Sequence, residues 1–305
     1  MTETDIKMKR KPNLFLVGAA KSGTTAMDTY LARHPDVFMA IKEPHYFATD
    51  LLDESRPGRQ WERYCRIFAP VEDQKVVGES SVFYLYSKEA AQNIRAFNPD
   101  AKILIHLRNP IEVIPSHHSQ NIFENNEPLE DLREALAAEE DRLQGNRLPN
   151  HVWNKVTCYR DFVHFHDQVK RFMDEFPREQ VKINFFDDLK KDTREVFRDT
   201  CRFLEIDPEF DAGFEVMNPN KKMRSKKAMD LFVRKPPAWL SAIAKTIMPL
   251  ESRTALKAKI KEMNTAKPKR DALPEDIREA LKRDLAEDVE KLSHLVDRDL
   301  MHWVA

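Results

Sequence analysis

Five short apolar runs recur along the first two-thirds of the chain, and stretches with helical periodicity separate them. The apolar runs lie at residues 14–17, 37–40, 75–78, 102–107 and 181–186. Several are nearly continuous in hydrophobicity, as parallel strands covered on both faces are. The helical patterns lie at residues 24–33, 88–97, 128–143, 159–176 and 192–204. This alternation predicts an α/β fold, a three-layer domain with a central parallel sheet of about five strands.

The C-terminal part has a different pattern. Residues 218–269 are basic and contain five prolines, which predicts irregular structure with short helices. Pro274 then opens a helix whose apolar residues recur every three or four positions from Ile277 to Val296. Because no repeat or linker interrupts the chain, we expect a single domain over residues 1–305. We expect residues 1–12 to be flexible and residues 218–305 to form a helical C-terminal extension packed on the domain.

Charge and cysteine content narrow the class of protein. The chain has 50 basic and 51 acidic residues, so no overall field attracts nucleic acid or an anionic membrane. Cys65, Cys158 and Cys201 have none of the usual metal spacings, which argues against a zinc site or disulfide framework and favours core thiols. The first apolar run is too short for a signal peptide or a membrane anchor. We therefore expect a cytoplasmic protein with no integral membrane segment and no nucleic-acid partner.

The segment GAAKSGTT, at residues 18–25, contains two of the six glycines in the chain. A strand, a glycine turn and a helix aim backbone N–H groups and the positive end of the helix dipole at an anion. The segment is therefore a candidate phosphate loop. A Walker A loop has lysine directly after its second glycine, whereas here Thr24 has that position and Lys21 lies inside the turn. This difference argues against ordinary nucleotide hydrolysis.

A second motif follows the fourth apolar run. Asn109 is a good N-cap and Pro110 a favoured first helical residue, so a helix should begin beside Arg108. Ser116 then lies about two turns into that helix, on the face that bears Asn109. A guanidinium group suits a terminal phosphate, and a hydroxyl can share it. The alternative is a salt-bridging arginine and a serine on the helix surface.

A third segment, IKEPHYF at residues 41–47, supplies acid–base chemistry. Pro44 disfavours the helical region for Glu43, which predicts an extended backbone with Glu43 and His45 on the same side. A carboxylate and an imidazole that face one cleft can remove a proton from a hydroxyl. The alternatives are a solvated carboxylate and a structural histidine. His106 lies inside an apolar run, and we interpret it as a core histidine.

These three segments resemble those of sulfotransferases that use 3′-phosphoadenosine 5′-phosphosulfate (PAPS), in particular soluble bacterial members related to glycan O-sulfotransferases. In that family the residues that match Arg108 and Ser116 bind the 3′-phosphate of the donor. The first segment resembles the loop that binds the 5′-phosphosulfate, through Lys21, Ser22, Gly23, Thr24 and Thr25.

The resemblance also implies catalytic roles and further nucleotide contacts. It implies that Glu43 is the catalytic base, that His45 orients it or the acceptor, and that Lys21 neutralises the bridging oxygen. Tyr159 is similar to a tyrosine that contacts the adenine, with a core aromatic as the alternative. The basic segment NPNKKMRSKKAM resembles one that closes over the nucleotide, and Arg224 in it is our candidate for a second 3′-phosphate contact.

Another part of the resemblance bears on the acceptor. GESSVFYLYSKEA, which contains Glu79 and Tyr84, resembles the segment after the third strand of the family. Relatives of the glycan enzymes often carry lysine where this chain has Ser80, which argues against an anionic polysaccharide.

The implied function is that of an enzyme, a PAPS-dependent sulfotransferase. It would move a sulfuryl group to a hydroxyl of a small-molecule, lipid, sugar or carrier-tethered acceptor, without a metal. The products would be a sulfate ester and adenosine 3′,5′-bisphosphate (PAP). The alternatives are a P-loop-type nucleotide kinase or NTPase, and a non-catalytic nucleotide-binding module.

Overall fold

The computed structural model of the chain divides into two compact units. One unit is Met1–Met217 with Leu273–Ala305, and the other is Asn218–Ala272. The second unit contains a short antiparallel pair of strands, β6 (Lys222–Met223) and β7 (Thr265–Ala266). The structure describes residues 8–41, 43–52, 59–150, 154–215, 222–223, 265–266 and 272–305.

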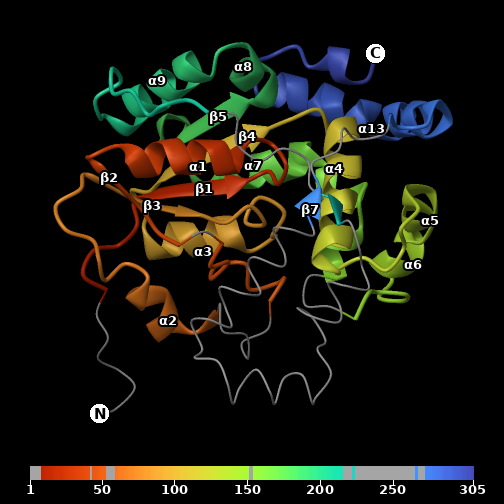
Figure 1. Ribbon diagram of the computed structural model, residues 1–305, viewed down its shortest axis with the longest axis horizontal. Helices are drawn as coiled ribbons and strands as arrows, with labels where there is room; N and C mark the ends of the chain where they lie inside the picture. Colours follow the sequence, from red (N-terminus) through yellow and green to blue (C-terminus); the bar gives the residue numbers. More distant parts are fainter. Residues whose placement is uncertain are drawn as a thin grey trace. The chain divides into compact units, whose positions relative to one another are not determined.

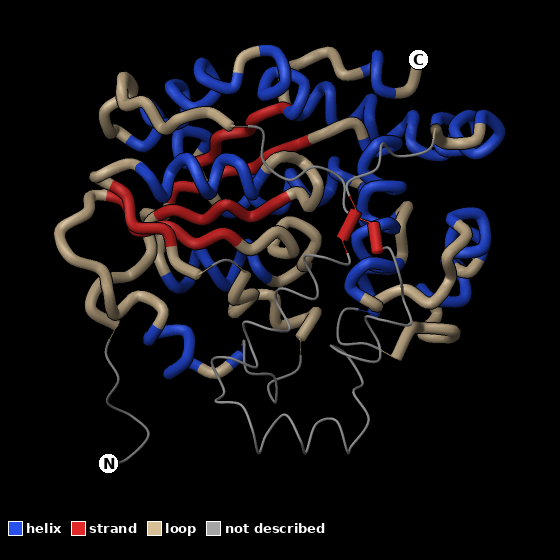
Figure 2. Tube along the Cα trace, in the orientation of Figure 1, coloured by secondary structure: helices blue, strands red, loops and turns tan. Residues whose placement is uncertain are grey.

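A five-stranded parallel sheet forms the centre of the first unit. Its strand order is β2-β3-β1-β4-β5, and every neighbouring pair is parallel (Figure 2). The carboxyl ends of all five strands therefore lie along one edge, where α/β folds place their ligands. The bounds of the strands are β1 (Leu14–Gly18), β2 (Val37–Met39), β3 (Val76–Ser80), β4 (Lys102–Leu107) and β5 (Val181–Phe185).

Helices cover both faces of the sheet (Figure 1). The α-helices are α1 (Thr24–Arg33), α2 (Trp61–Arg66), α3 (Ala90–Phe97), α4 (Pro110–Glu124), α5 (Leu132–Ala137), α6 (Glu139–Leu143), α7 (Phe165–Glu175), α8 (Phe186–Lys191), α9 (Thr193–Leu204) and α13 (Glu275–Leu295). Short 3-10 helices are η2 (Asn154–Thr157), η3 (Asp161–Val163), η4 (Arg178–Gln180) and η6 (Met301–Trp303).

The central strand β1 separates two hydrophobic cores. Leu14 and Leu16 pack with residues of α1, α8 and α9 on one face of the sheet. Phe15 and Val17 pack on the other face with residues of α3, α4, α7 and α13. Successive side chains of a strand point to opposite faces, so a run buried throughout needs a layer on each side. This packing confirms the three-layer α/β fold that the sequence predicts.

Two of the predicted helices have different bounds in the structure. The pattern at residues 128–143 forms two short helices. Asp131 accepts a hydrogen bond from the N–H of Arg133 and so caps α5, which begins after it and ends at Ala137. The pattern at residues 159–176 becomes α-helical only at Phe165, after the short 3-10 helix η3. There, Asp288 of α13 accepts the N–H groups of Phe165 and His166, which sets the start of α7.

The C-terminal helix and the cysteines are as the sequence predicts. The apolar stripe of α13, from Ile277 to Leu292, is buried. All three cysteines are buried thiols, and burial raises the pKa of Cys158 to about 12. Within the described ranges, no helix has the length and apolar character needed to cross a membrane.

Candidate active site

The three motifs found in the sequence meet at the carboxyl edge of the sheet. The phosphate loop follows β1, the segment with Glu43 follows β2, and Arg108 follows β4. Arg108 donates a hydrogen bond from Nη1 to the backbone oxygen of Lys21, at 3.1 Å. Glu43 donates its backbone N–H to the oxygen of Ser80, the last residue of β3, at 2.8 Å. The arginine and the loop are therefore in direct contact.

The phosphate loop has the geometry of an anion site. Gly23, with φ of 87°, precedes α1, and no side chain among the described residues caps that end of the helix. A Cβ at Gly23 would lie 3.2 Å from the ring of Phe186, so a larger residue would crowd this turn. Ser22 is fully buried, and its Oγ has no hydrogen-bond partner among the described residues. A buried hydroxyl normally has a partner, and an anion bound in the loop would supply one.

Lys21 lies inside the turn in an unusual backbone conformation. Its φ is 66°, in the left-handed region that residues other than glycine rarely adopt. Such strain concentrates at functional sites. The Nζ atom lies 3.4 Å from Oε1 of Gln120 on α4. The backbone of Lys21 therefore contacts Arg108, and its side chain contacts α4.

Arg108 stands at the start of α4 as predicted, and it forms an ion pair of the kind that the alternative interpretation allowed, with Glu112 as the partner that we had not named. Its Nε and Nη2 donate to Oε2 of Glu112 at 3.0 and 2.6 Å, and its Cζ lies 4.4 Å from the ring centroid of Phe186. The side chain of Asn109 accepts the N–H of Ile111 and caps α4, as expected. The guanidinium group is therefore fixed by a carboxylate and an aromatic ring.

The remaining predicted nucleotide contacts lie in different environments. Ser116 is buried on α4, and Thr24 and Thr25 form the first turn of α1. Tyr159 is fully buried and donates its hydroxyl to Glu127 at 2.9 Å. This packing is that of the core aromatic, and the adenine contact stays a prediction. Arg224 lies outside the described residues.

Glu43 and His45 lie together, but their backbone is not extended. Their φ angles are 66° and 53°, so the prediction of an extended segment was wrong. The backbone N–H of Glu43 donates to the oxygen of Ser80, and that of His45 donates to Oγ of Ser81. These two hydrogen bonds fix the turn of the backbone. Oε2 of Glu43 lies 3.6 Å from Nε2 of His45. The Glu43 side chain is 39% exposed and that of His45 is 5% exposed, so the carboxylate can reach a solute.

A buried carboxyl group, Glu79, lies at the end of β3 close to this segment. It accepts hydrogen bonds from the hydroxyls of Tyr64 and Ser81, at 2.6 and 2.8 Å. Burial raises its pKa from 4.5 to about 7, and hydrogen bonds from Tyr64, Tyr84 and Ser81 offset part of that rise. The group therefore titrates near neutral pH because removing its charge from water is unfavourable.

This titration should make stability depend on pH. The folded chain binds the Glu79 proton more tightly than the unfolded chain, so its contribution to stability is greatest below pH 4.5 and declines until about pH 7. Glu79→Gln cannot ionise and should lack the decline. The free energy of unfolding of the variant minus that of the parent should therefore increase by roughly 2 kcal/mol between about pH 5 and about pH 8, because only the parent loses stability over this range. Urea denaturation at both pH values measures this; a constant difference would show that the group is not perturbed.

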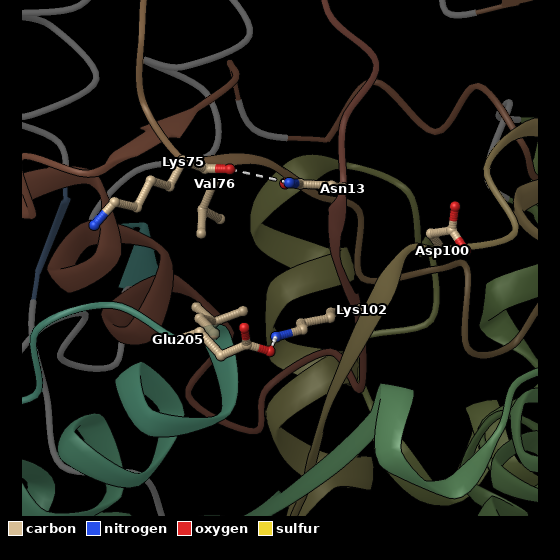
Figure 3. Close-up of a pocket in the computed structure, with 7 residues that line it drawn as sticks. Asn13, Lys75, Val76, Asp100, Lys102 and Glu205 are labelled. Carbon is tan, nitrogen blue, oxygen red and sulfur yellow. Dashed lines mark hydrogen bonds and ion pairs between the residues drawn. The ribbon is translucent and has the colours of Figure 1, made fainter.

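A cavity of about 300 Å³ lies at the opposite edge of the sheet, at the amino ends of the strands (Figure 3). Both lysines that line it form ion pairs: Lys102 lies 2.7 Å from Glu205, and Lys75 lies 3.2 Å from Asp36. Strands of about five residues place this edge roughly 15 Å from the phosphate loop. The cavity therefore belongs to a different part of the molecule from the candidate active site. Its lining residues are Asn13, Lys75, Val76, Asp100, Lys102, Leu204 and Glu205.

Three contacts of the site escaped the sequence analysis. Glu112 could have been found, because a helix that begins at Pro110 places it one turn from Arg108. Phe186 was assigned to the end of the fifth strand, whereas it is the first residue of α8 and packs on Arg108. Ser81 had no distinguishing signal, because its role depends on its hydrogen bonds to Glu79 and His45.

A loop with a buried hydroxyl, an arginine bound to that loop and a carboxylate near an imidazole together form an arrangement suited to an anionic ligand beside an ionisable pair. A family model named sulfotransferase domain matches residues 11–293. The chain therefore belongs to the sulfotransferase family. His106, which the sequence analysis interprets as a core histidine, is fully buried within β4 and lies 3.2 Å from Asn184.

Individual relatives agree with this family. A solved sulfotransferase from Alicyclobacillus acidocaldarius is 32% identical, with a TM-score of 0.70, over 97% of this chain and 100% of that one. Human heparan sulfate glucosamine 3-O-sulfotransferase 6 is 32% identical over 114 residues, which are 37% of this chain and 32% of that protein. A membrane-associated sulfotransferase of Dictyostelium discoideum is 33% identical over 135 residues, 42% of this chain and 28% of that protein. The match thus spans about a third of these two curated relatives.

Proposed function

We propose that this chain transfers a sulfuryl group from PAPS to an acceptor hydroxyl, releasing a sulfate ester and PAP. The observation that carries the proposal is the hydrogen bond between Arg108 and the backbone of Lys21. It joins the residue expected at the 3′-phosphate to the loop expected at the 5′-phosphosulfate. One nucleotide with both groups could therefore contact both motifs.

The phosphate loop is suited to the 5′ end of the donor. The buried hydroxyl of Ser22 and the N-terminal turn of α1, which contains Thr24 and Thr25, supply donors for phosphate oxygens. Lys21 supplies a positive charge that can offset the negative charge growing on the bridging oxygen as the sulfur–oxygen bond breaks. Gly23 provides the positive φ that the turn requires.

The second motif is suited to the 3′-phosphate. Arg108 already binds a carboxylate through two nitrogen atoms, and a phosphate has the same geometric match to a guanidinium group. Ser116 lies on the same helix as Glu112, the carboxylate that occupies Arg108. In this proposal Glu112 orients the guanidinium group and Phe186 provides an apolar surface beside it.

The proton of the acceptor is assigned to Glu43. The acceptor oxygen forms a bond to sulfur, its proton passes to the Glu43 carboxylate, and PAP leaves with the electrons of the broken bond. His45, at 3.6 Å, orients that carboxylate. We propose a hydroxyl acceptor on a small molecule, lipid, sugar or carrier. The name of the human relative gives a sugar hydroxyl as that protein's acceptor.

Ligand-induced stabilisation tests the donor. We expect PAP to raise the melting temperature, with about 2.7 kcal/mol of stabilisation at 100 times Kd, and AMP and ATP to do so far less at the same concentration. In Arg108→Ala the preference for PAP over AMP should fall, because AMP lacks the 3′-phosphate. Equal stabilisation by ATP with magnesium would favour the kinase or NTPase alternative.

Turnover tests the catalytic part of the proposal. The purified chain is incubated with PAPS labelled in the sulfuryl group and a metabolite extract, and labelled products are separated from the donor. A sulfate ester that forms only with active protein supports the proposal. Binding of PAP with no labelled product from any hydroxyl fraction would leave the non-catalytic module as the better description.

A further inference from the structure

A layer of hydroxyl groups lies between Glu79 and the segment that carries Glu43. Glu79 is fully buried, and its two oxygens accept hydrogen bonds from Tyr64 and Ser81; the hydroxyl of Tyr84 lies near it and helps to lower its pKa. A buried carboxyl group is costly unless hydrogen bonds satisfy it, so the hydroxyls of Tyr64 and Ser81 have defined directions. Their protons point toward Glu79, which leaves their oxygen lone pairs available to other donors.

The hydroxyls of Ser81 and Tyr84 accept hydrogen bonds from backbone N–H groups of the segment that carries Glu43. His45 donates to Oγ of Ser81 at 3.0 Å, and Phe47 donates to the hydroxyl of Tyr84 at 3.2 Å. The Ser81 hydroxyl is therefore both an acceptor for this segment and a donor to Glu79, and the Tyr84 hydroxyl is an acceptor that lies beside the same carboxyl group. Hydrogen bonds arranged in such chains strengthen one another in a buried environment.

The segment needs this support because of its backbone conformation. Glu43 and His45 both have positive φ, which is unfavourable for residues with side chains. Such conformations persist only where surrounding contacts determine them. The backbone N–H groups of Glu43, His45 and Phe47 donate to three acceptors, which are the backbone oxygen of Ser80 and the hydroxyls of Ser81 and Tyr84. Two of these three contacts depend on hydroxyls that lie beside Glu79, and Ser81 donates to it directly.

We propose that Glu79 is a positioning residue for the acid–base pair: it orients the hydroxyls of Ser81 and Tyr84, and these hold the segment with Glu43 and His45 in its strained conformation. This role rests on the proposed function, because only sulfuryl transfer makes Glu43 a general base that needs to be positioned. Glu79 is fully buried, so it acts through the hydroxyls rather than on the acceptor.

Hydrogen exchange tests the positioning without any need for turnover. In Glu79→Gln one acceptor oxygen becomes an NH2 group, so one hydroxyl can no longer donate on that side. We expect amides in a peptide covering residues 43–48 to exchange at least about tenfold faster than in the parent. The phosphate-loop peptide, residues 18–25, should exchange as in the parent. Ser81→Ala and Tyr84→Phe should reproduce the effect and serve if Glu79→Gln does not fold.

A matched control and a rescue separate this role from general loss of stability. Tyr30→Phe removes a buried tyrosine hydroxyl that donates to the backbone of Glu215 at 2.7 Å, in the core on the other face of the sheet. Exchange at residues 43–48 should be unchanged in it. Ser81→Thr retains the hydroxyl and should restore slow exchange that Ser81→Ala loses. Fast exchange in Tyr30→Phe as well would overturn the specific role of Glu79.

Kinetics then connects the segment to the reaction. In Glu79→Gln, Ser81→Ala and Tyr84→Phe we expect kcat to fall at least about tenfold with the affinity for PAP unchanged, because only the acid–base pair is displaced. Slow exchange in all three variants would overturn the positioning role whatever their activity. Fast exchange together with parental kcat would show that the segment does not serve catalysis. If the parent transfers no sulfuryl group but the variants still exchange fast, the structural role of Glu79 is supported and the proposed function is contradicted.

Discussion

Glu43→Gln should lower kcat for sulfuryl transfer on the order of a thousandfold while leaving the affinity for PAP unchanged. A positioned general base typically contributes a hundredfold to ten-thousandfold, and glutamine has the same shape but cannot take the proton. The donor is assigned to the loop after β1 and to Arg108, which this substitution leaves in place. Steady-state kinetics with labelled PAPS and calorimetric titration with PAP measure the two quantities.

The control for this prediction is Glu72→Gln. Glu72 is an exposed carboxylate that precedes β3, at the amino edge of the sheet, so its variant loses the same charge far from the site. Its kcat should match the parent. If Glu43→Gln keeps parental kcat, Glu43 is not the base. If it loses PAP binding as well, the carboxylate supports the donor site rather than the acceptor.

Much of the fold could be predicted because its signals are local. The run at 14–17 is apolar at every position, and only a central strand buried on both faces accounts for that in an α/β chain. The helix at Thr24–Arg33 has the predicted bounds, since a glycine turn marks its start. Two short helices were missed. The start of α8 was missed because Phe186, its first residue, continues the apolar run of β5. Helix α2 was missed because it has only six residues and depends on aromatic packing around Tyr64.

The site was less predictable wherever its geometry depends on distant residues. The positions of Arg108 and Ser116 could be predicted, because the N-cap residue and the proline that begin α4 are adjacent in the sequence. The turn at Glu43 and His45 depends on Ser81, which is 36 residues from His45, and no local pattern reports that bond. The burial of Glu79 is equally non-local, because Tyr64 reaches it from α2. Residue types were therefore easier to infer than the conformations that they adopt.

Lys21→Ala should lower kcat on the order of a hundredfold to a thousandfold, with a smaller loss of PAP affinity. The amine is assigned to the bridging oxygen, where negative charge grows during the reaction, and one such donor is typically worth about 3 kcal/mol. The backbone oxygen of Lys21, which binds Arg108, remains in the alanine variant. The link between the two donor motifs should therefore survive, and binding should be affected less than turnover.

Two further variants decide whether charge or structure causes the loss. Lys75→Ala removes an exposed amine at the amino edge of the sheet, and its kcat should equal that of the parent. Gln120→Ala removes the contact at 3.4 Å without removing the charge of Lys21, and it should lose less activity than Lys21→Ala. An equal loss in both would mean that the amine acts by holding α4. Parental kcat in Lys21→Ala would contradict the assignment of Lys21 to the bridging oxygen, because a group that stabilises developing charge cannot be removed without raising the barrier.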